Sequence, residues 1–383
     1  MLSAMAAMLA ATAWARPKYK VLHAFTGGKD GGGPGGSLLL DKQGNVYGTD
    51  VNTVFELTPH AKGKWSLKVL HTFGHGNDGS GPFGGLIFDP EGNLYGTTVA
   101  GGGPYKYGTI FELTPGSDGW KEAVLHSFGF NSHGCCPKAG VVMDNAGNLF
   151  GTATVAFELS PSSNGWKETV LHHFPSYQGD GSGPYAVVLD AAGNLYGVTT
   201  MGGTSNRCGG GCGTAYELRR TSGGGWKEHI LHDFGTGGDG MVFPGGTLLL
   251  DSAGRLYGTS YGDFNGRVYR LSRGPDGHWK AAIQYRFTGG ANGGGPSGGV
   301  VMDKAGNLYG TTTVGGDPNC DCGVVYKLAP GANGKWKYTV LHRFTGYDGA
   351  QPGQLILDGK GNLYGTTITG GAGGAGVAFE LTP

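Results

Sequence analysis

The sequence lacks several features that mark familiar classes of protein. Its 28 basic and 28 acidic side chains leave no net charge, and neither sign is gathered into a run. A nucleic acid or an anionic membrane is therefore not an expected partner. No stretch keeps a sustained helical period, which excludes a helical fold. No long apolar run follows residue 15, so we expect no stable membrane insertion of the mature chain.

Residues 1–15, MLSAMAAMLAATAWA, form the only long apolar run, and they end in the small-x-small pattern Ala13-Trp14-Ala15 that leader peptidases cut. The run is too short to span a bilayer. A positive segment ahead of it is missing, which leaves open a start upstream of Met1. We predict a signal peptide over 1–15 that is cleaved on export, and a single secreted or periplasmic domain over 16–383.

Cysteine is scarce, and its six copies come as close pairs: Cys135 with Cys136, Cys208 with Cys212, and Cys320 with Cys322. An even count fits disulfides in an oxidising compartment. The CxxxC and CxC spacings lack matching histidines and make a poor zinc signature, so we expect no metal and no other cofactor. At Cys135-Cys136 two interpretations stay open, a vicinal disulfide or two separate thiols or cross-links.

Glycine, in contrast, is abundant at 81 of 383 residues, and much of it belongs to a repeat. The unit DxxGNLYGT recurs about every 53 residues, a period typical of propeller blades or solenoids. The first glycines of its seven copies are Gly44, Gly92, Gly147, Gly193, Gly254, Gly306 and Gly361. Each unit splits into four strand-like runs, GGLIFD, NLYGT, VFELTP and WKExVLHxF, bounded by turn residues. Four antiparallel strands repeated around a ring make a β-propeller.

The two ends of the chain complete one blade. Tyr19–Phe25, YKVLHAF, is a fourth strand with no first three before it, and residues 376–383, GVAFELTP, are a third strand with no fourth after it. A solenoid would instead need distinct polar caps at its ends. We therefore predict an all-β, seven-bladed propeller of four-stranded blades, closed by the N-terminal strand.

The phrases GNLYGTT, GTIFELTP, GWKEAVLHSF and NDGSGPFGGLIFD resemble the Gloeo/Verruco (GloVer) tandem repeat of exported bacterial proteins. The resemblance covers nearly all of residues 19–383, and it implies a repeat architecture and export without an established activity. Some members carry an anchor, and none is evident here, which leaves surface attachment open. DxxGNLY is also similar to a strand pair of NHL-type and SMP30-like propellers, which supports the fold alone.

Internal repetition separates architectural residues from candidate functional ones. A residue present in every blade is spread around the ring and cannot form one site. The histidines of the VLHxF phrase and the glutamates of FEL and WKE fall in this class. Among the glutamates, only Glu91 stands outside it. A hydrolase that uses two carboxylates is therefore not expected, and no GxSxG elbow is present. The repeated Asp-Gly phrase offers too few oxygens for calcium, and we interpret it as an Asx-type turn.

The segment between NLYGT and FEL varies most in length, which indicates a variable loop face suited to recognition. It is shortest in the blades of Val51 and Ala153, where we expect a depression in the surface between the longer loops of neighbouring blades. Unrepeated polar, aromatic and cysteine residues on this face are candidate binding residues, although each taken singly could be solvated loop decoration. They are Tyr105, Tyr107, His133, Cys135, Cys136, Lys138, Tyr177, Tyr185, Arg207, Asp263 and Arg267.

Two functions follow from this set. The first is an extracellular, monomeric recognition scaffold that binds a carbohydrate or surface partner without catalysis, since Tyr and Arg suit such contacts. The second is a polysaccharide lyase acting on a uronic-acid polymer by β-elimination. His133 or a tyrosine would then be the base, and Arg207 or Lys138 would hold the carboxylate. The sequence favours the first.

Overall fold

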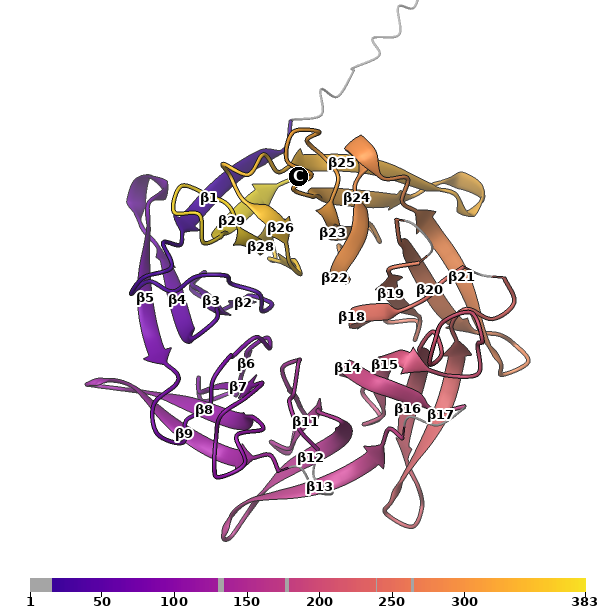
Figure 1. Ribbon diagram of the computed structural model, residues 1–383, viewed down its shortest axis with the longest axis horizontal. Helices are drawn as coiled ribbons and strands as arrows, with labels where there is room; N and C mark the ends of the chain where they lie inside the picture. Colours follow the sequence, from indigo (N-terminus) through magenta and orange to yellow (C-terminus); the bar gives the residue numbers. More distant parts are fainter. Residues whose placement is uncertain (1–15, 130–133, 176–178, 239, 263–264) are drawn as a thin grey trace, which may run out of the picture.

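The computed structural model describes residues 16–129, 134–175, 179–238, 240–262 and 265–383. In this part of the chain seven antiparallel sheets surround one axis, as Figure 1 shows, and the only helical elements are three short 3-10 turns. The predicted seven-bladed β-propeller is confirmed. The predicted signal peptide, residues 1–15, lies outside the described residues.

Each blade runs from an innermost strand at the axis to an outermost strand at the rim. Blade 1 contains β2 (Leu39–Leu40), β3 (Val46–Thr49), β4 (Thr53–Pro59) and β5 (Trp65–Thr72), with η1 (Ala61–Gly63) between the last two. Blade 2 contains β6 (Ile87–Phe88), β7 (Leu94–Thr98), β8 (Thr109–Gly116) and β9 (Gly119–Ser127). Blade 3 contains β10 (Val142–Met143), β11 (Leu149–Thr152), β12 (Val155–Ser162) and β13 (Gly165–His173). Blade 4 contains β14 (Gly181–Leu189), β15 (Leu195–Gly202), β16 (Thr214–Arg220) and β17 (Trp226–Asp233).

The remaining three blades follow the same order. Blade 5 contains β18 (Pro244–Leu250), β19 (Leu256–Ser260), β20 (Arg267–Arg273) and β21 (Trp279–Arg286). Blade 6 follows η2 (Gly290–Asn292) and contains β22 (Gly294–Met302), β23 (Leu308–Val314), β24 (Val324–Pro330) and β25 (Trp336–Arg343), with η3 (Ala332–Gly334) before β25. Blade 7 contains β26 (Ala350–Pro352), β27 (Ile356–Leu357), β28 (Leu363–Thr369), β29 (Val377–Thr382) and β1 (Lys18–Ala24).

Blade 7 closes the ring as the sequence predicts. Strand β1 pairs antiparallel with β29, and the register places Tyr19 opposite Leu381 and Val21 opposite Phe379. Leu22 and Phe25 then enter a core shared with blade 1, where the ring of Phe25 lies 5.1 Å from that of Phe55. The two ends of the chain thus hold one sheet together.

The repeat consensus follows from packing inside each blade. The glycine of NLYGT lies opposite the aromatic residue of FEL in the third strand, as Gly48 does with Phe55. A Cβ at Gly48 would lie 2.5 Å from Cζ of Phe55, so only glycine fits under the ring. The DxxG turn is also as predicted, since Asp41 accepts from the amides of Gln43 and Asn45.

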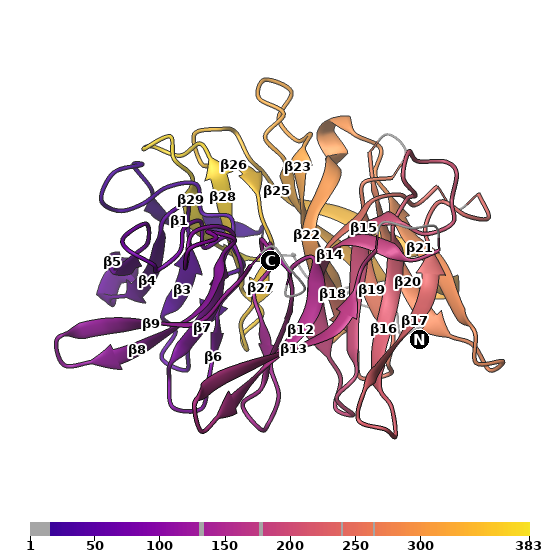
Figure 2. The same cartoon turned by 60° about the horizontal axis from the view of Figure 1, so that its bottom comes forward.

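The variable loops and the connections between blades share one face. Val51 and Val99, on the second-to-third-strand loops of blades 1 and 2, donate their amides to Gly32 and Gly81 in the connections. In Figure 2 the long β15–β16 and β23–β24 loops rise on the upper side, whereas the β16–β17 hairpin points to the lower side. We call the upper side the loop face.

A repeated contact joins the outermost strands of neighbouring blades. The histidine of VLHxF faces the Asp of the following connection, with His71 Nε2 3.3 Å from Asp78 Oδ2 and His342 Nε2 2.9 Å from Asp348 Oδ2. This Asp also accepts hydrogen bonds from backbone amides that precede it, as Asp78 does from Gly74. The Asx turn that we predicted would instead use an amide that follows the Asp. A third residue joins this His–Asp contact from the outermost strand of the next blade. Around the ring it is Leu67, Glu122, Glu168, Glu228, Ala281, Tyr338 and Tyr19.

The junction of blades 1 and 2 should make folding stability depend on pH. Burial and the nearby Asp78 carboxylate raise the pKa of Glu122 from 4.5 to about 7. The folded state therefore holds a proton that the unfolded state releases, and the free energy of unfolding should fall as pH rises from about 4.5 to 7. Urea unfolding at several pH values should show a weaker decline for Glu122→Gln. An equal decline in both proteins would contradict this assignment.

No helix among the described residues is long and apolar enough to cross a membrane.

Candidate functional site

A cavity of about 640 Å³ opens on the axis of the ring, and residues from all seven blades line it. Its volume falls within the range of small-ligand pockets, which is roughly 300–1,000 Å³. The lining comes from the connections that enter the innermost strands, from those strands themselves, and in blades 4 to 7 from a residue at or just past the end of the second strand. The cavity therefore belongs to the loop face.

One ring of lining residues is formed by the residue that follows a proline in each blade. Around the ring it is Gly35, Phe83, Lys138, Tyr185, Gly245, Ser297 and Gly353. Four blades thus place glycine or serine here, and three consecutive blades place large side chains. We call Phe83, Lys138 and Tyr185 the arc. Because its members are not repeated, the arc gives one side of a near-symmetric ring a chemistry of its own.

Contacts between blades fix the backbone of the arc. The threonine of NLYGT in the preceding blade donates its hydroxyl to a carbonyl at or next to each arc residue. These bonds join Thr49 to Gly84 at 3.1 Å, Thr97 to Ala139 at 2.8 Å, and Thr152 to Tyr185 at 2.6 Å. The proline before Lys138 also packs against blade 2, since a Cβ at Gly108 would lie 2.9 Å from Cδ of Pro137. Rigid blades therefore hold the arc in place before a ligand arrives.

The residue before each proline has a left-handed backbone. Four blades meet this demand with Gly33, Gly81, Gly183 and Gly295, but the other three place Cys136 (φ 59°), Phe243 (φ 51°) and Gln351 (φ 56°) there. A non-glycine residue in this region costs roughly 1–2 kcal/mol. Phe243 is 38% exposed and lines the cavity, so its strain is not offset by full burial. Strain kept at such a position is a sign of function.

Replacing Phe243 with glycine should change the unfolding free energy by no more than about 1 kcal/mol, because relief of backbone strain offsets the lost apolar contact. A buried control, Phe234→Ala, should cost roughly 3–5 kcal/mol; Phe234 is fully buried in the core shared by blades 4 and 5. Urea unfolding measures both. Equal losses in the two variants would show that Phe243 is an ordinary core residue.

The electrostatics of the cavity are simple. Among the lining residues in the described part of the chain, Lys138 is the only one with a charged side chain, and Tyr185 and Tyr261 are the only other titratable groups. Burial, followed by the nearby Tyr261, raises the pKa of Tyr185, so its phenol stays protonated at neutral pH. The cavity thus offers one exposed ammonium beside aromatic rings, which suits a ligand with a flat or apolar ring face and a negative group.

The structure brings two of the predicted binding residues, Lys138 and Tyr185, to the cavity. Tyr105 is 64% exposed on the β7–β8 loop, and Arg207 is exposed on the β15–β16 loop; neither lines the cavity. Arg267 begins β20, is only 8% exposed and does not line the cavity. His133, Tyr177 and Asp263 lie outside the described residues. We expected a depression in the loop face over the short loops of blades 1 and 3. The cavity that the structure shows lies instead on the axis of the ring.

The cysteines divide into two kinds. Cys208–Cys212 and Cys320–Cys322 form disulfides, each within one long loop of the loop face. Cys135 and Cys136 are free thiols, so the structure contradicts the vicinal bond. A physical reason is that the Cα atoms of adjacent residues joined by a trans peptide lie about 3.8 Å apart, less than the roughly 4.4–6.8 Å usual for disulfides. The pair instead anchors the connection, because Cys136 donates its amide to the carbonyl of Tyr107 at 2.8 Å.

Three aromatic cavity residues were missed by the sequence analysis. They are Phe83, Phe243 and Tyr261, which are 40%, 38% and 51% exposed. The signal was available in principle, because aligning the seven Xaa-Pro-Xaa connections shows Phe83 where three other blades have glycine. Which position of the connection faces the axis could not be derived from the repeat alone.

The comparisons with known proteins agree with the repeat. The profile of the Gloeobacter/Verrucomicrobia repeat family matches residues 13–156 and 261–383, which is more than half of the chain. The chain belongs to this family. The matched segments include Phe83, Lys138 and Tyr261, whereas Tyr185 lies between them. No curated protein matches the chain in sequence.

Solved structures share the fold of this repeat protein. A streptogramin B lyase has a TM-score of 0.59 and 14% identity over 97% of this chain and 99% of that one. A catalytically inactive virginiamycin B lyase from Staphylococcus aureus, solved with quinupristin, has a TM-score of 0.57 and 16% identity over 96% and 100%. The extracellular domain of a protein described as a hybrid two-component system from B. thetaiotaomicron gives 0.59 and 15%, over 96% of this chain and 41% of that one. At these identities the likeness concerns the fold alone.

Proposed function

We propose that the protein is an exported recognition protein that binds an acidic carbohydrate, or a similar ring-bearing partner, in the axial cavity without catalysis. The observation that carries this proposal is the arc. Phe83 and Tyr185 supply aromatic rings and Lys138 supplies a cation at positions where the other four blades have glycine or serine. Sugar rings pack on aromatic faces, and an ammonium pairs with a carboxylate.

Export is part of the proposal. The small-x-small pattern ending at Ala15 supports it from the sequence, and the two disulfides in the loops support it from the structure. Disulfides persist in the periplasm and outside the cell, and they are rare in the cytosol.

The alternative of a polysaccharide lyase has less support. β-Elimination needs a base near the ligand, and the described lining residues contain no carboxylate and no imidazole. Tyr185 is a poor base because its raised pKa keeps the phenol protonated. Of the three residues that the lyase hypothesis uses, Lys138 lines the cavity, Arg207 does not, and His133 lies outside the described residues.

One experiment tests both functions. The mature chain is incubated with a panel of acidic and neutral polysaccharides while calorimetry records binding and ultraviolet absorbance records any unsaturated product. We expect binding of an acidic member with flat absorbance. A rise in absorbance that His133→Ala or Lys138→Gln abolishes would replace the proposal with the lyase. Failure of every ring-bearing acid to bind would contradict recognition at this cavity.

A further inference from the structure

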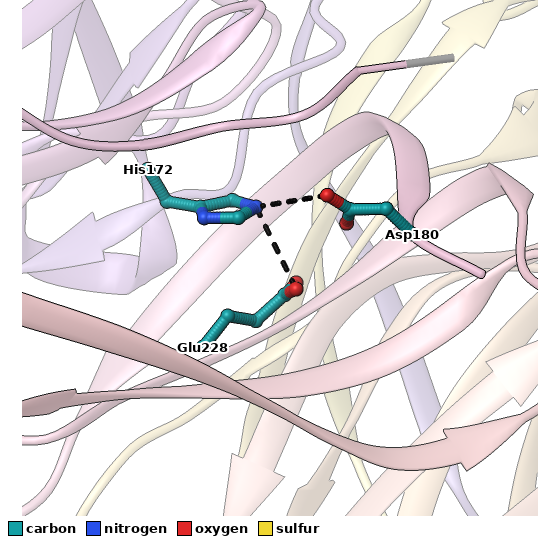
Figure 3. A group of neighbouring side chains, drawn as sticks. All are labelled: His172, Asp180 and Glu228. Carbon is teal, nitrogen blue, oxygen red and sulfur yellow. Dashed lines mark ion pairs between the residues drawn. The ribbon is translucent and has the colours of Figure 1, made fainter. Parts of the chain in front are cut away.

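Three metal-ligating side chains from three segments meet at the junction of blades 3 and 4. His172 lies near the end of β13, Asp180 directly precedes β14, and Glu228 lies on β17 (Figure 3). The imidazole points between the two carboxylates. The trio lies between outermost strands, and none of its members lines the axial cavity, so it is independent of the proposed function.

The distances suit a small cation. His172 Nε2 lies 3.4 Å from Asp180 Oδ2 and 3.6 Å from Glu228 Oε2, and the three ligand atoms all lie within 4.8 Å of one another. Bonds of about 2.0–2.1 Å in a tetrahedral zinc site place ligand atoms roughly 3.3 Å apart. A slight contraction of the trio would therefore form three corners of such a site. In the described part of the chain no other group of three such residues meets this spacing.

The trio is incompletely satisfied by the protein itself. His172 Nε2 and Glu228 Oε1 are buried atoms without a hydrogen-bond partner, and the Glu228 side chain is only 13% exposed. A divalent cation held between the imidazole and the two carboxylates would give these groups a partner that the protein does not supply.

Other junctions show that the ring does not need the trio. The position of Glu228 is Leu67 at the junction of blades 7 and 1, and Ala281 at the junction of blades 4 and 5. The His23–Asp30 pair is kept beside Leu67, with His23 Nε2 3.1 Å from Asp30 Oδ2. The glutamate is therefore an addition to a working junction, and its removal restores a side chain that the fold already accepts elsewhere.

We propose that His172, Asp180 and Glu228 bind one divalent transition-metal ion of the zinc class, which clasps blade 3 to blade 4. One imidazole and two carboxylates supply three ligands, so the fourth position is open to water. Calcium is a poor fit because it prefers six to eight oxygen ligands.

The test uses the mature chain after treatment with a chelator. Calorimetry with zinc chloride should give one strong site per chain, and zinc should raise the melting temperature because it binds the folded state. Glu228→Ala, which copies Ala281 of the next blade, and Asp180→Asn should each weaken this site at least tenfold. The matched control, His23→Gln, changes a His–Asp pair without a glutamate and should keep both the affinity and the stoichiometry.

Cobalt gives a second measurement that does not depend on stability. Bound Co²⁺ should produce visible absorption bands of a four-coordinate site in the parent and in His23→Gln, and the bands should be lost in Glu228→Gln, a replacement of nearly equal size. Absence of a stoichiometric zinc site in the parent, or zinc affinity unchanged by Glu228→Ala and Asp180→Asn, would overturn the proposal. Cobalt bands that persist in Glu228→Gln would overturn it as well.

Discussion

Removing residues 16–25 should destroy most of the folding stability of the mature chain. The deletion takes away β1, which is the outermost strand of blade 7. The pairing of β1 with β29 joins the two ends of the chain in one sheet. It also removes Phe25, which is fully buried, and Leu22, which is 8% exposed. Loss of a buried Phe costs roughly 3–5 kcal/mol and loss of a buried Leu roughly 2–5 kcal/mol. A domain is stable by only about 5–15 kcal/mol, so the ring should open or fail to fold.

Denaturant unfolding of the 16–383 and 26–383 chains measures this loss. Phe25→Ala should reproduce roughly 3–5 kcal/mol of it in a chain that still closes. Lys18→Ala is the matched control, because Lys18 lies on the same strand with an exposed side chain and should change stability by less than about 0.5 kcal/mol. A 26–383 chain that melts like the full mature chain would show that β1 does not close the ring.

Replacing Lys138 with glutamine should weaken binding of an acidic ligand by about 10- to 150-fold. A hydrogen bond to a charged partner contributes roughly 1.5–3 kcal/mol, and Lys138 is the only charged side chain among the described lining residues. A neutral ligand of the same ring structure should lose little affinity. Calorimetry with an acidic sugar and its neutral counterpart separates the two cases.

The aromatic part of the arc provides the matched comparison. Phe83→Gly copies the residue that blades 1, 5 and 7 carry at this position, and it should weaken acidic and neutral ligands alike. A central aromatic contact is commonly worth about 2 kcal/mol, or roughly 30-fold. Tyr105→Ala, on a loop away from the cavity, should change neither affinity. Equal effects of Lys138→Gln on both ligands would contradict a role for its charge.

The fold could be predicted from the sequence because each blade repeats the same strand order and the same side-chain packing. A glycine in NLYGT and an aromatic in FEL must occur together, since Gly48 leaves the space that Phe55 fills. The incomplete motifs at the two ends then required closure of one blade. Seven copies of one pattern give a signal that a single copy would not, and the register of β1 with β29 confirms it.

The site could be predicted only in part. Lys138 and Tyr185 stood out because they break the repeat, but the direction of a loop side chain depends on the backbone, which the sequence does not show. Arg267 also breaks the repeat, yet it starts a buried strand. His172 and Glu228 were missed for the opposite reason. Their positions recur in other blades, so a rule that dismisses repeated residues passes over the junction where, among the described residues, His, Asp and Glu ligand atoms lie within 4.8 Å of one another.

The most direct test of the proposed function is a crystal structure of the mature protein with the tightest-binding acidic saccharide from the panel. We predict that the saccharide occupies the axial cavity, with a sugar ring against Phe83 or Tyr185 and its carboxylate within hydrogen-bond distance of Lys138 Nζ. A saccharide bound on the outer loops near Tyr105 or Arg207, with the axial cavity free of it, would contradict the account.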